Sequence, residues 1–203
     1  MGSAWNGQGS FDRRGRDPVP GRGQGGAPGA RSAFTIVELM IVIAIIVIAL
    51  LAMSHTLVSS MQLTRVNRES ALATDGLRDM VETLQGVEDF SSVFKLYNDN
   101  PADDPGIPGS APGSNFAVQG LQAVDGDPDG LVGEIVFPTV GTVLREDIAM
   151  PELGMPHDLN GDGGLDGIDH AGNYRILPVL LRLRWKGSGV ERSMEIRTLL
   201  ADR

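Results

Sequence analysis

The chain contains no cysteine and few aromatic residues. Its 203 residues include 2 Trp, 2 Tyr and 6 Phe. Without cysteine, a disulfide bond, a thiol nucleophile and a Cys-ligated zinc site are all excluded. With so few aromatic side chains, a globular core must consist mainly of aliphatic residues.

Charge of either sign is unevenly distributed. Residues 1–33 hold five arginines against Asp12 and Asp17, so they carry +3 of a total of −9, and the rest carries −12. An acidic region repels phosphate backbones, so nucleic acid is not expected as a partner. No phosphate-binding loop or defensible catalytic set is present. We therefore expect the protein not to be an enzyme.

Residues 34–53 form a nearly continuous apolar segment. They read FTIVELMIVIAIIVIALLAM, and Leu39 to Met53 contains no polar residue. Twenty helical residues span roughly 30 Å, the thickness of the hydrocarbon core of a bilayer. The segment predicts one transmembrane helix. The positive charge before it predicts a cytoplasmic N-terminus and an exported C-terminal domain.

Glu38 is the one charged residue in this segment. A carboxylate deep in a bilayer costs about 2.5–3.5 kcal/mol. Phe34 lies four residues earlier, which is about one helical turn. Cleavage before Phe34 would place a new α-ammonium group within reach of Glu38, in the same chain or in a neighbour. That pairing gives a physical reason for the acid.

The junction of Ala33 with FTIVEL resembles the prepilin-peptidase site of type IV pilins and type II secretion pseudopilins. The resemblance covers roughly residues 31–60. It implies removal of residues 1–33 as a leader, cleavage between Ala33 and Phe34, and methylation of the new N-terminal Phe34. It also implies that Glu38 serves assembly and that prepilin peptidase and other pilin subunits are partners. The family usually has Gly where this chain has Ala33, and this leader is longer than most.

Two other interpretations of the N-terminus are less favoured. A signal anchor or Sec signal peptide is less favoured, because Leu50 to Thr56 offers no A-x-A cleavage site. Arg13 and Arg14 form a twin-arginine pair, but a Gly/Pro-rich stretch separates them from the apolar segment.

The remaining residues predict an α+β domain. Residues 54–86 continue the helix, because they contain no proline and Leu77, Met80, Val81 and Leu84 recur at helical spacing until Gly86. Residues 87–203 form the exported domain. Its strand candidates are Phe116–Leu121, Gly133–Phe137 and Val140–Leu144, and residues 179–200 form a C-terminal β-hairpin that turns at Gly187-Ser188-Gly189. The expected fold is pilin-like: a long N-terminal membrane-spanning helix packed on a small antiparallel sheet.

Residues 158–169 read DLNGDGGLDGID and match a calcium-loop template. Its ligand positions fall on Asp158, Asn160, Asp162, Gly164, Asp166 and Asp169, with Gly163 at the sharp turn. The loop resembles those of dockerins. An acidic turn without an ion is the alternative, and His157 and His170 on either side are interpreted as surface residues. A second acidic stretch, Asp125 to Gly130, is interpreted as a turn.

The sequence therefore favours a structural subunit, a minor pilin or pseudopilin anchored by one span in the cytoplasmic membrane, with its domain periplasmic or extracellular. It contacts membrane lipid before assembly. Pilus and secretion pseudopilus are not distinguished. The alternative is a Ca²⁺-dependent tip, adhesion or cargo-binding module on the same anchor.

Overall fold

A computed structural model describes residues 35–202, and the chain divides into two compact units that meet after Ile48. The boundary lies within helix α1 (Ile36–Gln85). Ala33 and Phe34 lie outside the described residues. The hydroxyl of Thr35 accepts a hydrogen bond from the backbone N–H of Glu38 at 3.2 Å. Thr35 therefore caps the start of α1 and satisfies one of the N–H groups that a helix leaves unpaired there.

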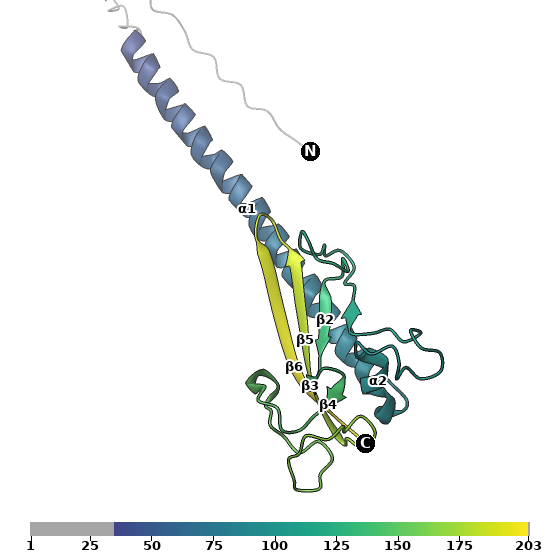
Figure 1. The fold of residues 1–203 in the computed structure, drawn as a ribbon. Helices are drawn as coiled ribbons and strands as arrows, with labels where there is room; N and C mark the ends of the chain where they lie inside the picture. Colours follow the sequence, from purple (N-terminus) through teal and green to yellow (C-terminus); the bar gives the residue numbers. More distant parts are fainter. Residues whose placement is uncertain (1–34, 203) are drawn as a thin grey trace, which may run out of the picture. The chain divides into compact units, whose positions relative to one another are not determined.

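The second unit, residues 49–202, contains a helix packed on an antiparallel sheet (Figure 1). The buried residues of α1 are Ala73, Leu77 and Leu84, and the partly buried Met80 and Val81 lie between them. Their spacing of three or four residues places them on one face of a helix. The predicted stripe is thus the core-facing side, and α1 ends one residue before Gly86.

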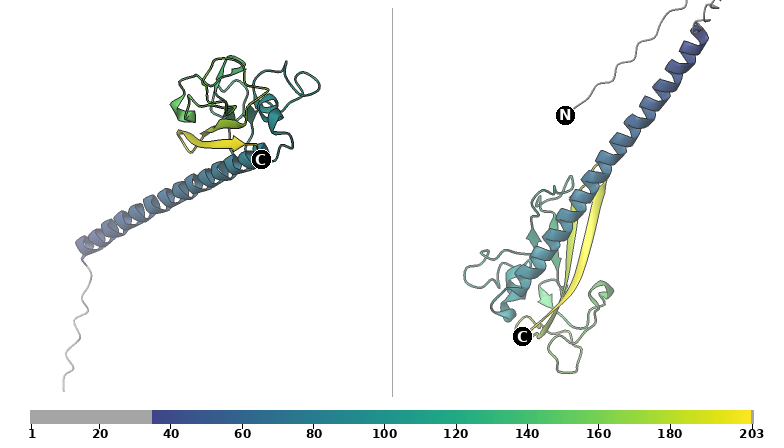
Figure 2. Two further views of the ribbon diagram at one scale, coloured as in Figure 1. Left: turned by 90° about the horizontal axis from the view of Figure 1, so that it is seen from below. Right: turned by 180° about the vertical axis from the view of Figure 1, so that it is seen from behind.

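The main sheet has the order β1 (Asn115–Phe116), β2 (Gly133–Val136), β5 (Ile176–Lys186), β6 (Glu191–Ala201). Every neighbouring pair is antiparallel. Seen along another direction, this sheet lies between α1 on one side and the irregular loops on the other (Figure 2). The α+β class predicted from the sequence is confirmed.

The C-terminal hairpin is the longest β element, with Lys186 opposite Glu191 and Val179 opposite Thr198. Its predicted turn was one residue too short. Val190 also belongs to the turn, where it is 64% exposed. Leu180 lies on the face of β5 opposite that of Val179 and Leu181, and all three are buried. β5 is an inner strand here, covered by α1 on one face and by loops on the other, so both faces are apolar.

Two of the predicted strands are largely wrong. Only Phe116 of Phe116–Leu121 lies in a strand, because Gly120 has φ 90° and the chain turns there. Val140–Leu144 is a tight hairpin, with β3 (Thr139–Val140) and β4 (Val143–Leu144) paired around Gly141. The structure also adds short helices, namely η1 (Phe90–Ser92), α2 (Val93–Tyr97) and η2 (Pro151–Leu153).

Tyr174 ties α2 to the segment before β5. Its hydroxyl donates to the carbonyl of Phe90 at 2.5 Å and accepts from the N–H of Phe94 at 3.2 Å. The Phe94 N–H lies in the first turn of α2, where no intrahelical acceptor exists. Burial raises the pKa of Tyr174 from 10.0 to about 12.

Candidate functional site

The apolar part of α1 differs from the other elements of the described chain in how much hydrophobic surface it exposes. Its large hydrophobic side chains from Ile36 to Leu63 are exposed, and none of its apolar window is buried within the chain. Residues 35–202 contain one helix long and apolar enough to cross a membrane. An exposed apolar surface of this size needs lipid or another apolar partner.

Glu38 lies in the first turn of this helix, and its side chain is exposed. The sequence offered one reason for the acid, a partner ammonium created by cleavage. The structure adds a second, because a carboxylate near a helix N-terminus interacts favourably with the helix dipole. Thr35 and Glu38 also have the spacing of a capping box, of which the Thr35 half is formed.

In the acidic loop, the predicted calcium-binding carboxylates of the first half are bonded to the loop's own backbone. Asp158 accepts hydrogen bonds from the N–H groups of Gly161 at 2.6 Å and Gly163 at 2.8 Å. Asp162 accepts from the Gly164 N–H at 2.7 Å and from the Asn160 amide at 2.9 Å. The Asn160 amide and then the Gly164 N–H hold the pKa of Asp162 below its ordinary value. These bonds fold the loop into a tight turn around its carboxylates.

The last two predicted calcium ligands, Asp166 and Asp169, accept hydrogen bonds from other groups than Asp158 and Asp162 do. Asp169 accepts from the N–H of Ala171 at 3.0 Å and from that of Leu144 at 3.3 Å. Asp166 accepts from the Ile168 N–H at 3.0 Å, and the same oxygen lies 3.0 Å from Nε2 of His170. Calcium binding by all six predicted residues stays a prediction.

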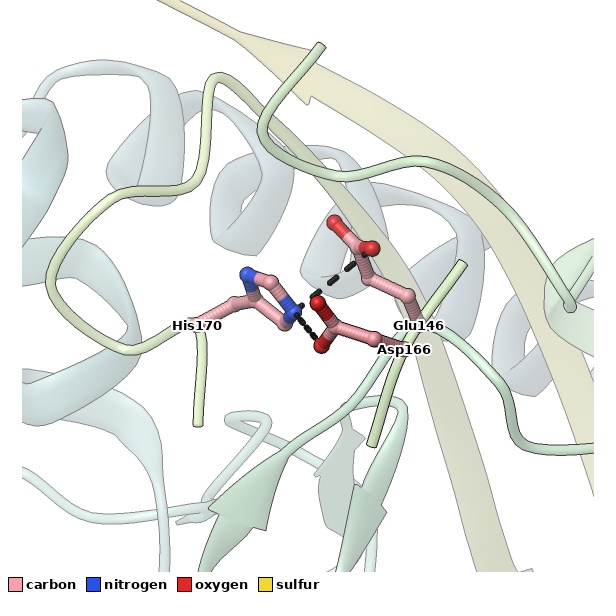
Figure 3. Close-up of side chains that lie close together, drawn as sticks. All are labelled: Glu146, Asp166 and His170. Atoms are coloured by element: carbon pink, nitrogen blue, oxygen red, sulfur yellow. Dashed lines mark hydrogen bonds and ion pairs between the residues drawn. The ribbon is translucent and has the colours of Figure 1, made fainter. Parts of the chain in front are cut away.

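The structure brings together one group of side chains that could hold a metal ion and that the sequence did not reveal as a group. Among residues 35–202, the set of three or more Asp, Glu or His side chains with ligand atoms within 4.8 Å of one another is Glu146, Asp166 and His170. The three side chains point toward one another (Figure 3). His170, interpreted from the sequence as a surface residue, is fully buried, and so is Glu146. His157 is exposed, as expected.

Backbone hydrogen bonds bring Glu146 to this loop. The N–H of His157 donates to the Glu146 carbonyl at 3.2 Å, and the N–H of His170 donates to the Leu144 carbonyl at 2.9 Å. These bonds fasten one end of the loop to the last residue of β4 and the other end to the segment that follows β4. Inside the loop, Oε1 of Glu146 accepts from the N–H groups of Leu159 at 2.8 Å and Asn160 at 3.1 Å.

The second acidic stretch behaves as a turn in the described chain. Asp129 accepts from the N–H of Leu131 at 2.8 Å, and Asp125 pairs with Lys186 at 2.7 Å. Neither residue belongs to the group that could hold a metal ion.

In residues 35–202, the fold and these two regions define an α+β protein with one helix able to span a membrane and a group of Glu, Asp and His side chains of which the Glu and the His are buried. No family model, curated protein or solved structure matches the chain.

Proposed function

We propose that the chain is a pilin-type structural subunit, a minor pilin or pseudopilin, made as a precursor and assembled through α1. One observation carries the proposal. An exposed, continuous apolar helix begins directly after a small-residue/Phe junction and has its single acid four residues after that Phe. An ordinary anchor needs the apolar run but has no use for the junction or for the acid.

The exposed surface of α1 supports this function physically. Lipid would cover it before assembly, and the same helices from other subunits would cover it in a filament core. The second unit is folded on the later part of α1 and has its own apolar core. Such a domain is able to remain folded while the apolar part moves from lipid into a filament, because the buried contacts of residues 73–200 do not involve residues 36–63.

Processing tests the proposal. The full chain is co-expressed with a prepilin peptidase, and the intact mass of the membrane-extracted protein is measured. We expect a product that begins at Phe34 and carries one added methyl group. Ala33→Leu should block cleavage, because a site that selects a small residue cannot accept an isobutyl group. Ala33→Gly is the matched control and should be cleaved. A product beginning at any other residue, or cleavage of the Leu variant, would refute the proposed processing.

A calcium-dependent tip or cargo-binding module is a second candidate, and one observation favours it. The loop of residues 158–164 is folded around the carboxylates of Asp158 and Asp162 by hydrogen bonds from its own backbone. A loop held in that form has less conformational entropy to lose on binding a cation. The proportion of this chain in purified filaments distinguishes the two candidates, because a tip subunit is rare and a shaft subunit abundant.

A further inference from the structure

The geometry points to a binding site for one divalent first-row transition metal of the zinc type, formed by Glu146, Asp166 and His170. It differs from the predicted calcium loop in two of its three ligands and in the chemistry of its donors. It does not depend on the proposed function of the chain.

The first argument is a buried carboxylate oxygen without a hydrogen bond. Oε1 of Glu146 accepts two backbone N–H groups, but Oε2 has no hydrogen-bond partner although the residue is fully buried. Burying an unpaired charged oxygen is strongly unfavourable. Oε2 lies 3.5 Å from Nε2 of His170 and faces the space between the three side chains (Figure 3). A cation in that space would provide the missing partner.

The second argument is the orientation of the His170 ring. Its Nδ1 lies 3.1 Å from Oδ1 of Asn173, which is an acceptor, so Nδ1 carries a proton. In the neutral ring, Nε2 then presents a lone pair toward the carboxylate oxygens of Glu146 and Asp166. Three electron-rich atoms facing one another repel unless a positive charge lies between them. A second partner that orients the ring through its other nitrogen is usual for a metal-binding histidine.

The third argument is the spacing of the donor atoms. Zinc bonds of about 2.0–2.2 Å in a tetrahedron place neighbouring ligand atoms about 3.3–3.6 Å apart. Nε2 of His170 lies 3.0 Å from Oδ1 of Asp166 and 3.5 Å from Oε2 of Glu146. These two distances therefore lie close to those around a small tetrahedral ion.

Charge and access also fit. Two carboxylates neutralise a divalent ion, which a buried site requires. The side chains of Glu146 and His170 are fully buried, whereas that of Asp166 is 49% exposed. The open side at Asp166 offers an entry path and a fourth position for water. Calcium prefers six to eight oxygen ligands, so a nitrogen and two carboxylates favour a zinc-type ion.

Such an ion would fasten the end of the acidic loop to the segment after β4. The chain has no cysteine, so this metal link would do in the domain what a disulfide does elsewhere. The competing arrangement is a doubly protonated His170 that donates from Nε2 to the two carboxylates, in which case no metal binds.

The test uses the full chain in nonionic detergent, made without an oligohistidine tag and stripped of metal with a chelator. Zn²⁺ is titrated at neutral pH with a competing chromophoric chelator, and Co²⁺ is added separately to record its visible spectrum. We expect one Zn²⁺ per chain and a Co²⁺ spectrum typical of four-coordination. A large excess of Ca²⁺ should not displace the Zn²⁺.

Matched variants locate the site. His170→Gln and Glu146→Gln should weaken Zn²⁺ binding at least tenfold, and Glu146→Gln keeps an oxygen for the Leu159 and Asn160 N–H groups. His157→Gln removes an exposed histidine next to the same loop and should bind as the wild type does. Asp162→Asn lies in the predicted calcium loop and should also leave Zn²⁺ binding unchanged.

A measurement on the wild type covers the case in which a variant fails to fold. The chain has 3 histidines, so ¹⁵N-labelled histidine gives few imidazole signals. Zn²⁺ should shift the Nε2 signal of His170 and leave those of His55 and His157 in place. The site would be refuted by the absence of stoichiometric Zn²⁺ binding, by unchanged affinity in folded His170→Gln, or by a shift confined to another histidine.

Discussion

Gly76 provides a sharp test of how α1 packs in the second unit. It lies on the core-facing side of the helix, next to the loop that contains Val118. A methyl group at position 76 would lie 2.6 Å from both γ-carbons of Val118. Ordinary contacts between carbon atoms are about 3.5–4.0 Å. Val118 is nearly buried, and its branched side chain has little rotamer freedom with which to yield.

Two opposing effects decide the outcome of Gly76→Ala. Alanine in place of glycine inside a helix adds about 1 kcal/mol of stability. Overpacking a well-filled core costs about 1–3 kcal/mol. We therefore expect a net loss of about 1 kcal/mol, which lowers the melting temperature of a domain this size by about 2–4 °C. In a Val118→Ala background both γ-carbons are gone and the remaining close contact is with the Cβ of residue 118 at 3.2 Å, so Gly76→Ala should raise stability, by up to about 1 kcal/mol.

The sign reversal is measured by thermal unfolding of the full chain in detergent. The fluorescence of Trp185, which is buried, reports on the domain, and Trp5→Phe removes the other tryptophan. Gly172→Ala is the control, since nothing lies within 4 Å of a Cβ there. If Gly76→Ala raises the melting temperature equally in both backgrounds, α1 does not pack against Val118 as described.

Further predictions concern the tyrosines and the acidic loop. Tyr174→Phe leaves the Phe94 N–H and the Phe90 carbonyl without a partner, so it should cost about 1–3 kcal/mol, measured in the same unfolding assay. Because burial raises the pKa of Tyr174 from 10.0 to about 12, the folded state favours the protonated phenol. That stability is fully present below pH 10 and is lost as the pH rises toward about 12. Melting scans at increasing pH should show this loss of stability. The loss should be smaller in Tyr174→Phe, because Tyr97 is then the remaining tyrosine whose pKa is raised by burial. If the acidic loop binds Ca²⁺, a tenfold excess over Kd adds about 1.4 kcal/mol, or about 3–6 °C, and Asp158→Ala should abolish this increment but Asp129→Ala should not. An equal calcium shift in the Asp158→Ala protein would exclude the loop as the site.

The long elements could be predicted from the sequence because their signals are repeated many times. In α1 the buried positions from Ala73 to Leu84 recur over about three turns, and in the hairpin the burial alternates along most of β6 and the second half of β5. The two-residue strands could not be predicted. Phe116 is in a strand only because Gly133 lies opposite it, and Val143 only because β4 folds back on β3. Five residues of α2 are too few for a periodic pattern, and tertiary contacts such as the Tyr174 bond hold them.

The group formed by Glu146, Asp166 and His170 could not be predicted from the sequence either. Asp166 and His170 are close in sequence, but Glu146 lies outside the predicted loop, between two charged neighbours that suggest an exposed turn. Its burial follows from the N–H groups of Leu159 and Asn160, which only the folded loop presents to it. Burial of His170 also depends on that arrangement. The residue types in the loop indicated a cation site, but the donor set that converges depends on the topology.

Glu38 now has two physical explanations, and one substitution separates them. If Glu38 serves only the helix N-terminus, Glu38→Gln should be tolerated in assembly, because glutamine also completes a capping box. If its charge pairs with the α-ammonium of Phe34 in a filament core, the Gln variant leaves that ammonium without a counter-charge in a water-free environment. Removing one partner of a buried ion pair costs about 3–5 kcal/mol. The Gln variant should then insert into the membrane normally and be cleaved, yet fail to enter filaments.

Cross-linking between subunits measures this outcome. The native chain has no cysteine, so single cysteines introduced on α1 report neighbouring subunits by cross-linking without background. Wild-type cross-linking of the Gln variant would show that the charge of Glu38 is not needed for assembly.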